Sequence, residues 1–304
     1  MAEAKWCEAC GADLEDPAAP ICVACGERQI TADGYCSSCG HKQPAPRDHM
    51  ELRDGVSVAI TDRGIKHRDN EDAAAIGALP TGGAVLVVCD GVSSTPGSAV
   101  ASLAAATAAR DLLIERVGAA PNGRIDEALI EATALAQVRA ASAPVPAVNP
   151  NDPHSGGGPP SSTLVAAVAR PVEGRVEISV AWVGDSRAYW VADGIATALT
   201  DDHELGGSLT RWLGADSLDP TPELTYLMAE GPGRLVVVSD GLWRYADPSP
   251  ELASLIGRLE VDHATSMELA DAMVKHALAG GGHDNITVAI WDSADGPVEP
   301  VKPN

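Results

Sequence analysis

Acidic residues recur in this sequence where an apolar stretch ends or a glycine turn begins. Asp90-Gly91 follows the apolar run 84–89, and Asp240-Gly241 follows the apolar run 234–239. Similar settings hold three more acidic positions, which are Glu71-Asp72 after Asp69-Asn70, Asp185 after Gly184, and Asp284 after Gly280, Gly281 and Gly282. A single Asp-Gly pair is usually no more than a turn. An ordered set of such positions instead indicates a shared site, because a carboxylate at the end of a buried strand is rigid and can reach a cleft.

Carboxylates that converge on one point repel one another unless cations lie between them. Oxygen ligands without convergent histidine or cysteine suit hard divalent ions, which are magnesium or manganese. The glycine after Asp90 and after Asp240 lets a backbone carbonyl approach an ion. The acidic set therefore predicts a magnesium or manganese centre.

Six of the seven cysteines form three Cys-x-x-Cys pairs before residue 43, and a glycine follows each pair. Two thiolates at this spacing can face one metal ion, and glycine permits the left-handed turn that brings backbone N–H groups towards sulfur. In a reducing compartment this pattern favours metal over disulfide. Two pairs complete a tetrahedral site, so we expect one structural zinc ion with no open position for catalysis.

The spacing between the pairs does not determine which cysteines bind zinc. Ten residues separate Cys25 from Cys36 and eleven separate Cys10 from Cys22, and both gaps fit a zinc ribbon. An aromatic residue precedes Cys7 and Cys36, as in many second knuckles, whereas isoleucine precedes Cys22. We therefore favour Cys22, Cys25, Cys36 and Cys39 as the ligands, with Cys7 and Cys10 either half of an incomplete ribbon or ligands of a second zinc ion.

Strands and helices that alternate from about residue 55 must hold the acidic set. Short apolar runs predict strands, and Ala- and Leu-rich stretches of greater length predict helices. The expected strands are 56–61, 84–89, 163–169, 176–183, 187–191, 234–239 and 285–291, and the expected helices are 98–117, 125–141 and 263–279. The proline- and glycine-rich segment 144–160 is typical of a loop. This order favours an α+β fold of antiparallel sheets covered by helices.

The changes in composition along the chain predict four segments. Residues 1–43 are expected to form a zinc ribbon, 44–54 a linker that begins with two prolines, 55–292 the main domain, and 293–304 a C-terminal tail. Cys89 lies in an expected core strand, where cysteine behaves as a small buried hydrophobe.

The formal net charge of −22 argues against nucleic acid and anionic membranes as partners. No stretch reaches the roughly 18 apolar residues of a membrane span, and the first ten residues lack the apolar core of a signal peptide. We therefore expect a cytoplasmic protein. Hydrophobic residues make up 45% of the chain without any Phe, so Ala, Val, Leu and Ile must build the core.

Six motifs, in order from about residue 55 to 292, resemble the type 2C family of metal-dependent serine/threonine protein phosphatases. They are Thr61-Asp62-Arg63-Gly64 with Asn70-Glu71-Asp72, Val88-Cys89-Asp90-Gly91, Ser162-Thr163-Leu164, Val183-Gly184-Asp185-Ser186-Arg187, Val238-Ser239-Asp240-Gly241 and Gly282-His283-Asp284-Asn285-Ile286-Thr287-Val288. The resemblance implies a four-layer α-β-β-α sandwich of two antiparallel sheets flanked by helices. It also implies hydrolysis of phosphomonoesters by a water activated between two Mn²⁺ or Mg²⁺ ions.

The resemblance further implies a role for each acidic position. Asp90 would bridge both ions, and Gly91 would offer its carbonyl to one of them. Asp240 and Asp284 would bind the first ion, whereas Glu71, with Asp72 nearby, would lie on the side of the second ion. Asp185 would hold, together with Asp240, the third ion that bacterial members can bind.

One position departs from the family pattern. The arginine that grips the substrate phosphate is replaced by His67, with Arg68 beside it. A neutral histidine cannot form the bidentate fork of arginine. Either Arg68 substitutes, or His67 acts when protonated, or phosphate binding is weak, or His67 is an ordinary surface residue. Two further regions depart from the family pattern. They are the turn after Gly91 and the short segment 202–227, which resembles the region of the family's mobile flap.

The intact acidic set favours an active phosphatase over two alternatives, which are a pseudophosphatase and a zinc-ribbon interaction module with an inert second domain. The family resemblance implies a phosphoserine or phosphothreonine protein as substrate, made by a serine/threonine kinase in bacterial signal transduction. The ribbon is expected to dock a partner or another domain.

Overall fold

The computed structural model describes residues 20–31, 34–80, 82–93, 95–120, 123–145, 158–261 and 265–293. The chain separates into two compact units, Met1–Asp48 and His49–Asn304. Cys7 and Cys10, most of the expected loop 144–160 and nearly all of the expected tail lie outside the described residues.

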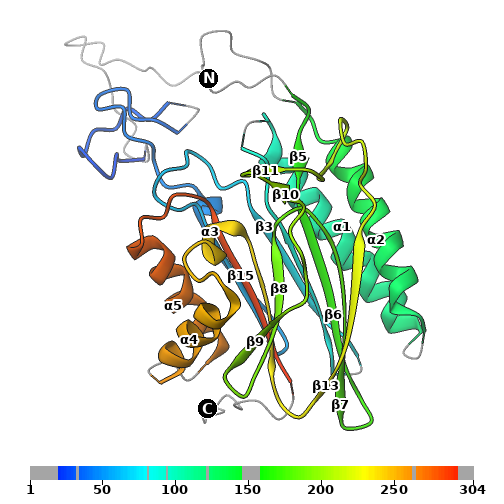
Figure 1. Cartoon of the computed structure of the whole chain (residues 1–304). Coiled ribbons are helices and arrows are strands. Elements are labelled where there is room, and N and C mark those ends of the chain that lie inside the picture. The colour runs from blue at the N-terminus through cyan, green and yellow to red at the C-terminus, as the bar shows by residue number, and fades with distance from the viewer. Residues whose placement is uncertain are drawn as a thin grey trace, which may run out of the picture. The chain divides into compact units, whose positions relative to one another are not determined.

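The second unit contains two antiparallel sheets, of which the larger has the strand order β1-β2-β15-β14-β8-β9. Its strands are β1 (His49–Asp54), β2 (Ser57–Asp62), β15 (Ile286–Asp292), β14 (Arg234–Val238), β8 (Arg187–Ala192) and β9 (Ile195–Ala198). The helices on its outer face are α3 (Asp240–Trp243), α4 (Ser249–Glu260) and α5 (Ser266–Ala279) (Figure 1).

The smaller sheet has five strands in the order β13-β7-β6-β4-β3. They are β13 (Glu223–Glu230), β7 (Arg175–Val183), β6 (Leu164–Val172), β4 (Ala84–Cys89) and β3 (Ala73–Ala78). Helices α1 (Ser98–Ala119) and α2 (Ile125–Ala141) pack together on the outer face of this sheet (Figure 1). None of the helices in the described ranges combines the length and the apolarity that a bilayer crossing requires.

Strand β4 shows how the sequence divides the core into layers. All six of its residues are buried. Val85 and Val87 face the helices α1 and α2, whereas Leu86 and Val88 face the other sheet, because successive side chains of a strand point to opposite faces. A third core lies under α4 and α5. Two antiparallel sheets with helices on both outer faces confirm the predicted α-β-β-α sandwich.

Tryptophan supplies the bulk that a core without Phe needs between the sheets. Trp182, Trp190 and Trp291 are nearly or fully buried there, beside many Ala and Val side chains. The helix layer on the other side of the smaller sheet is built mainly from alanines, including Ala105, Ala109 and Ala132. Alanines at a helix contact let the two helix axes approach closely.

The segment expected to resemble a flap forms short strands within the described residues. β10 (Glu204–Leu205) pairs with β11 (Ser208–Leu209), and β12 (Leu213–Gly214) pairs with β5 (Ser161–Ser162). The remainder of the segment leads into β13.

Residues 44–54 differ from the expected linker. Pro46–Asp48 form one turn of 3-10 helix, and His49–Asp54 form β1, which pairs with β2 along its whole length. The two prolines indicate an unstructured connection, and the only apolar residues that mark the strand are Met50 and Leu52. Such a short alternation at a sheet edge is a weak sequence signal.

The described part of the first unit forms two matched turns around the cysteines. The N–H of Gly26 donates to the carbonyl of Cys22, and the N–H of Gly40 donates to the carbonyl of Cys36. Both glycines have positive φ, at 80° and 73°, which is the left-handed geometry predicted for the knuckles.

Candidate active site

Strand pairing brings the predicted acidic positions to one end of the sandwich. In the larger sheet, β14 lies between β15 and β8, and Val238 pairs with both Val288 and Arg187. Asp240 just after β14 therefore lies near Asp284 and Asp185, which precede the antiparallel neighbours. In the smaller sheet, Cys89 at the end of β4 pairs with Ala73 at the start of β3, so Asp90 and Asp72 share an end of the sheet.

The carboxylates of this cluster are poorly solvated. Asp72, Asp185 and Asp240 are 0%, 6% and 8% exposed, and Asp90 is half-buried. Burial, with the charge of Asp72 and Asp240 nearby, raises the pKa of Asp90 well above its usual range. Burial and the charge of Asp240 raise the pKa of Asp185 to about 7.

Three more acidic groups of the cluster behave in the same way. Burial raises the pKa of Asp72 to about 7, against the opposing effect of its hydrogen bonds from Ser239 and Thr287. Burial also raises the pKa of Glu71 and of Asp284. A divalent cation would favour the ionised form of such groups, because an opposite charge at close range offsets both desolvation and mutual repulsion.

Asp240 has one carboxylate oxygen that could accept a cation. Its Oδ1 atom is buried and accepts no hydrogen bond from the described part of the chain. A buried oxygen without a hydrogen-bond donor is costly, and hard cations bind such oxygens. The donor set thus fits magnesium or manganese. Groups of three or more ligand atoms within 4.8 Å occur, among the described residues, only at the cysteines, so the carboxylate oxygens are spaced more widely.

Backbone contacts fix Asp90 and Gly91 at the end of β4. The N–H of Asp90 donates to Thr163 Oγ1 at 3.0 Å, and its carbonyl accepts from the Thr163 N–H at 2.8 Å. A Cβ atom on Gly91 would lie 2.6 Å from the carbonyl oxygen of Glu71. Glycine is therefore required here for the Glu71 backbone to approach Asp90.

Asp72 joins the two sheets inside the cluster. Its Oδ2 accepts from Ser239 Oγ and from Thr287 Oγ1, both at 2.7 Å. Ser239 Oγ also accepts from the N–H of Thr287 at 3.0 Å. The fully buried Asp72 thus holds the strand end before Asp240 in place.

Asn285 performs a similar role for the loop that carries Glu71. Its Oδ1 accepts from the Glu71 N–H at 2.7 Å, and its Nδ2 donates to the carbonyls of Arg63 and Asp69. The sequence motif contains Asn285 and Ser239, but we did not predict them as site residues. Their polar side chains next to the predicted ligands Asp240 and Asp284 were the available signal.

His67 belongs to this site, and Arg68 points to a different contact. His67 Nε2 lies 3.1 Å from Asp284 Oδ1, and His67 Nδ1 lies 3.4 Å from Ser93 Oγ. Arg68 is half-exposed and lies beside Asp69, at 3.8 Å. The structure therefore brings His67 to a carboxylate of the cluster and places Arg68 beside Asp69.

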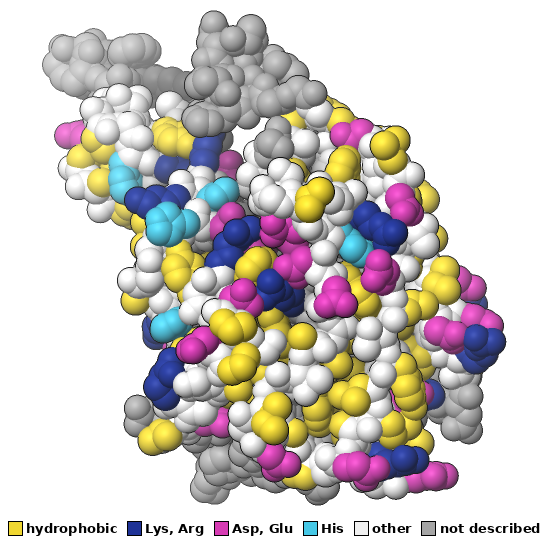
Figure 2. Space-filling view, viewed as in Figure 1, with side chains coloured by type: hydrophobic (Ala, Val, Ile, Leu, Met, Phe, Trp, Pro, Cys, Tyr) yellow, Lys and Arg dark blue, Asp and Glu magenta, His cyan; other side chains and the backbone are white. Residues whose placement is uncertain are grey.

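A further basic residue, Arg244, lies at the cluster and was not predicted. Its Nε donates to Asp240 Oδ2 at 2.8 Å, and its Nη2 lies 4.0 Å from Asp185 Oδ2. Acidic side chains with basic side chains among them gather over the upper middle of the face shown in Figure 2. Asp240 and Arg244 stand four residues apart, which was the only sequence signal for this contact.

The four predicted cysteine ligands come together in the first unit. The Sγ atoms of Cys22, Cys25, Cys36 and Cys39 lie within 4.8 Å of one another. Cys22 Sγ accepts from the Ala24 N–H at 3.4 Å and from Gln43 Nε2 at 3.3 Å. Loss of solvent opposes ionisation of Cys22, but hydrogen bonds from the Cys25 and Ala24 backbone lower its pKa to about 6. A thiolate is the form that binds zinc.

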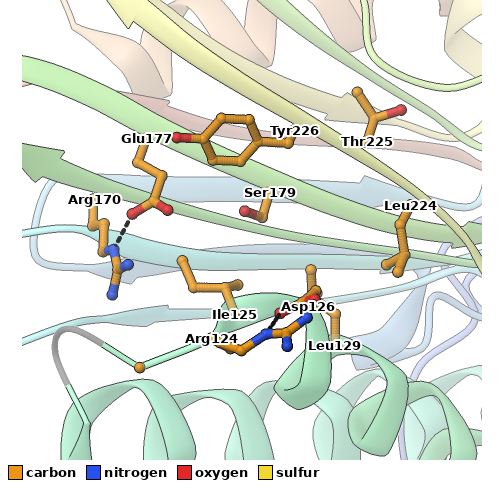
Figure 3. Close-up of a pocket in the computed structure, with 11 residues that line it drawn as sticks. Arg124, Ile125, Asp126, Leu129, Arg170, Glu177, Ser179, Leu224, Thr225 and Tyr226 are labelled. Atoms are coloured by element: carbon orange, nitrogen blue, oxygen red, sulfur yellow. Dashed lines mark hydrogen bonds and ion pairs between the residues drawn. The ribbon is translucent and has the colours of Figure 1, made fainter.

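One cavity lies apart from the acidic cluster, on the helix side of the smaller sheet. It has a volume of about 490 Å³ and lies between the N-terminus of α2 and strands β6, β7 and β13 (Figure 3). Arg170 and Glu177 form an ion pair at its wall, and Arg124 pairs with Asp126 at its edge. None of its lining residues belongs to the candidate active site.

Comparison with known proteins agrees with this architecture. The family model described as protein phosphatase 2C matches residues 63–278. The serine/threonine protein phosphatase PstP of Mycobacterium tuberculosis is 26% identical over 258 residues, which is 78% of this chain and 45% of that protein. The chain thus spans about half the length of the curated relatives it matches.

Solved structures show the same fold. A bacterial serine phosphatase has a TM-score of 0.60 at 23% identity, over 80% of this chain and 99% of that one. Stp1 from Staphylococcus aureus has a TM-score of 0.59 at 23% identity, over 83% of this chain and 98% of that one. The family model covers more than half of the sequence and the fold agrees, so this chain belongs to the protein phosphatase 2C family.

Proposed function

We propose that this protein is a metal-dependent serine/threonine protein phosphatase that hydrolyses phosphomonoesters with a metal-activated water. The observation that carries the proposal is the convergence of carboxylates from both sheets, with raised pKa values, at one end of the family's sandwich. A pseudophosphatase is not favoured, because a non-catalytic domain would have no need to keep this costly acidic cluster.

The proposed metal ligands are the acidic residues of the cluster. They are Asp90, Gly91 through its carbonyl, Asp240, Asp284 and Glu71, with Asp72 and Asp185 beside them. Two Mn²⁺ or Mg²⁺ ions held there would supply an activated water and offset the charge of the phosphoryl oxygens. Two residues of the chain hold the ligand-bearing segments in place. Asp72 accepts a hydrogen bond from Ser239, which directly precedes Asp240, and Asn285 accepts one from the N–H of Glu71.

His67 is the proposed contact for the substrate phosphate. Its side chain is partly exposed and already lies beside Asp284, so it can face both the cluster and a bound phosphate. A protonated imidazole donates from both nitrogens. Its single-point contact is weaker and less directional than an arginine fork.

Cys22, Cys25, Cys36 and Cys39 are proposed to hold one structural Zn²⁺. Their two matched turns and the N–H groups that point to sulfur support a closed thiolate site. In the described part of the first unit, Cys22 and Cys36 are the buried hydrophobic residues, so a zinc ion would supply much of the stability of this module. We propose that the module docks a partner or another part of a larger assembly.

The proposed substrate is a phosphoserine or phosphothreonine protein, formed by a serine/threonine kinase in bacterial signal transduction. The cytoplasm is the proposed location, because three Cys-x-x-Cys pairs suit a reducing compartment.

The decisive experiment measures hydrolysis of an aryl phosphate and of a phosphothreonine peptide with added Mn²⁺. The wild type should be active, and Asp90→Asn should lose activity by roughly a hundredfold or more, because a central metal ligand is removed. Asp111→Asn is the matched control, since Asp111 lies exposed on α1. A folded wild-type sample that is inactive with both Mn²⁺ and Mg²⁺ would refute the proposal.

A further inference from the structure

Arg244 places a permanent positive charge at the edge of the acidic cluster, with 49% of its side chain exposed. It directly follows the short helix α3, one turn after Asp240. Its Nε donates to Asp240 Oδ2 at 2.8 Å, and its Nη2 lies 4.0 Å from Asp185 Oδ2. The guanidinium therefore spans the two carboxylates that the family resemblance assigned to a third metal ion.

The aromatic ring of Trp243 lies against this guanidinium. Arg244 Cζ is 4.9 Å from the centroid of the Trp243 ring, and Arg187 Cζ is 3.6 Å from the same centroid. Trp243 Nε1 donates to the backbone carbonyl of Asp185 at 2.9 Å. The buried ring is thus tied to the loop that carries Asp185, and Arg244 stacks on it as a cation on a π face.

Arg187 also stacks on this ring, and its charge is paired with two other carboxylates. Two of its nitrogens donate to the two carboxylate oxygens of Asp202, at 2.9 and 2.8 Å, and a third contact reaches Asp247 at 2.7 Å. Its side chain is largely buried. The charge of Arg187 is therefore engaged away from the cluster, and Arg244 provides the positive charge at Asp185 and Asp240.

We propose that the Arg244 guanidinium is a built-in cation at the position between Asp185 and Asp240, and that it replaces a third metal ion there. This inference rests on the proposed metal centre for its setting, but the contact itself does not depend on catalysis. Guanidinium is permanently charged and only donates hydrogen bonds. It can offset carboxylate charge, but it cannot activate a water molecule as a metal ion does.

Electrostatic repulsion favours Arg244 alone, without a third metal ion, at this position. A divalent ion between Asp185 and Asp240 would lie next to the guanidinium, and like charges repel at that range. The described structure therefore supports a centre of two exchangeable ions with a permanent third charge.

Manganese counting on the 304-residue chain, supplied with zinc, tests the proposal. Equilibrium dialysis against a Mn²⁺ series, with Mn and Zn measured by mass spectrometry, gives the number of bound Mn²⁺ ions. The wild type and Arg244→Lys, which keeps the charge, should each bind two Mn²⁺ ions. Arg244→Gln should bind a third, and the double variant Arg244→Gln/Asp185→Asn should return to two. Arg258→Gln on the exposed side of α4 is the control.

Three Mn²⁺ ions in the wild type, or an unchanged count in Arg244→Gln, would overturn the proposal. Circular dichroism of Arg244→Gln checks that the variant is folded. If it is not, Arg244→Met, which keeps an apolar side chain without the charge, should bind the third ion instead. The count needs no turnover. A change from two ions to three in an inactive protein would support the role of Arg244 while refuting the phosphatase function, and active protein with an unchanged count would do the reverse.

Discussion

His67 Nε2 lies 3.1 Å from Asp284 Oδ1, at the place where the family pattern has an arginine. The contact connects the proposed phosphate-binding residue to a proposed metal ligand. Arg63 Nη1 donates to the backbone carbonyl of His67 at 2.6 Å and so holds the loop. The proposed phosphate contact and a proposed metal ligand therefore lie side by side, although they are far apart in sequence.

Replacement of His67 by arginine should strengthen binding of the substrate phosphate. Hydrogen bonds to a charged group contribute about 1.5–3 kcal/mol, and a second N–H donor to phosphate should lower KM for an aryl phosphate by roughly tenfold. Steady-state kinetics at saturating Mn²⁺ measure this change.

Arg68→Ala serves as the comparison for this variant. Arg68 is half-exposed beside Asp69, so its removal should change KM by less than about twofold. A large rise in KM for Arg68→Ala, with no effect of His67→Arg, would show that Arg68 grips the phosphate.

The raised pKa values predict how stability depends on pH when the carboxylate centre holds no divalent ion. The pKa of Asp72 and of Asp185 is about 7 in the folded protein, against about 4 for an unfolded carboxyl. Between these values the folded state binds more protons than the unfolded state, so stability falls as pH rises through this window. The melting temperature without divalent ions should therefore be higher at pH 5 than at pH 8.

Thermal melts at both pH values, with and without Mn²⁺, check this prediction. Mn²⁺ should raise the melting temperature most at pH 8, by on the order of 5 °C, because it binds ionised carboxylates. Asp185→Asn removes one titrating group and should reduce the difference between the two pH values. A melting temperature that rises from pH 5 to pH 8 without metal would contradict the burial argument.

The sequence predicted those elements best that are continuous and sharply bounded. β4 and α2 were predicted to the residue, because an apolar run before Asp-Gly and an Ala-rich helix are strong local signals. β3, β13 and α4 were missed. β3 is mostly alanine, β13 is a half-exposed edge strand, and α4 contains both proline and glycine.

The same contrast holds at the candidate site. Local sequence patterns predict the carboxylates at the strand ends. The residues that contact these carboxylates are harder to predict, because the contacts join distant parts of the chain. Ser239 and Asp72 are 167 residues apart in sequence, yet Ser239 Oγ lies 2.7 Å from Asp72 Oδ2 in the structure. The contact of Arg244 with Asp185 also depends on tertiary structure, since the two residues are 59 positions apart and their side chains lie 4.0 Å apart.

Zinc content should follow the four cysteines of the described cluster. Dialysed wild-type protein is expected to retain one zinc ion, and Cys36→Ser should lose it, because a three-thiolate site binds zinc much more weakly. Cys89→Ala is the control, since Cys89 is buried in β4 of the second unit. Elemental analysis gives the count, and two zinc ions would show that Cys7 and Cys10 hold a second one.

Gly241→Ala should damage the metal centre by moving the strand that follows Asp284. A Cβ atom at residue 241 would lie 1.9 Å from the carbonyl oxygen of Asn285 and 3.3 Å from the Cβ of Asp284. Overpacking of this kind costs about 1–3 kcal/mol of stability, and the displaced Asp284 should weaken Mn²⁺ binding by roughly tenfold or more.

Gly257→Ala is a matched control for this substitution. Gly257 lies inside α4, where a Cβ atom would meet nothing within 4 Å. Because alanine favours a helix interior by about 0.5–1 kcal/mol relative to glycine, Gly257→Ala should raise the melting temperature and leave Mn²⁺ affinity unchanged. Urea unfolding and Mn²⁺ titration of both variants separate the two effects. Equal Mn²⁺ affinity in Gly241→Ala and wild type would mean that the backbone of Asn285 can shift without moving the carboxylate of Asp284.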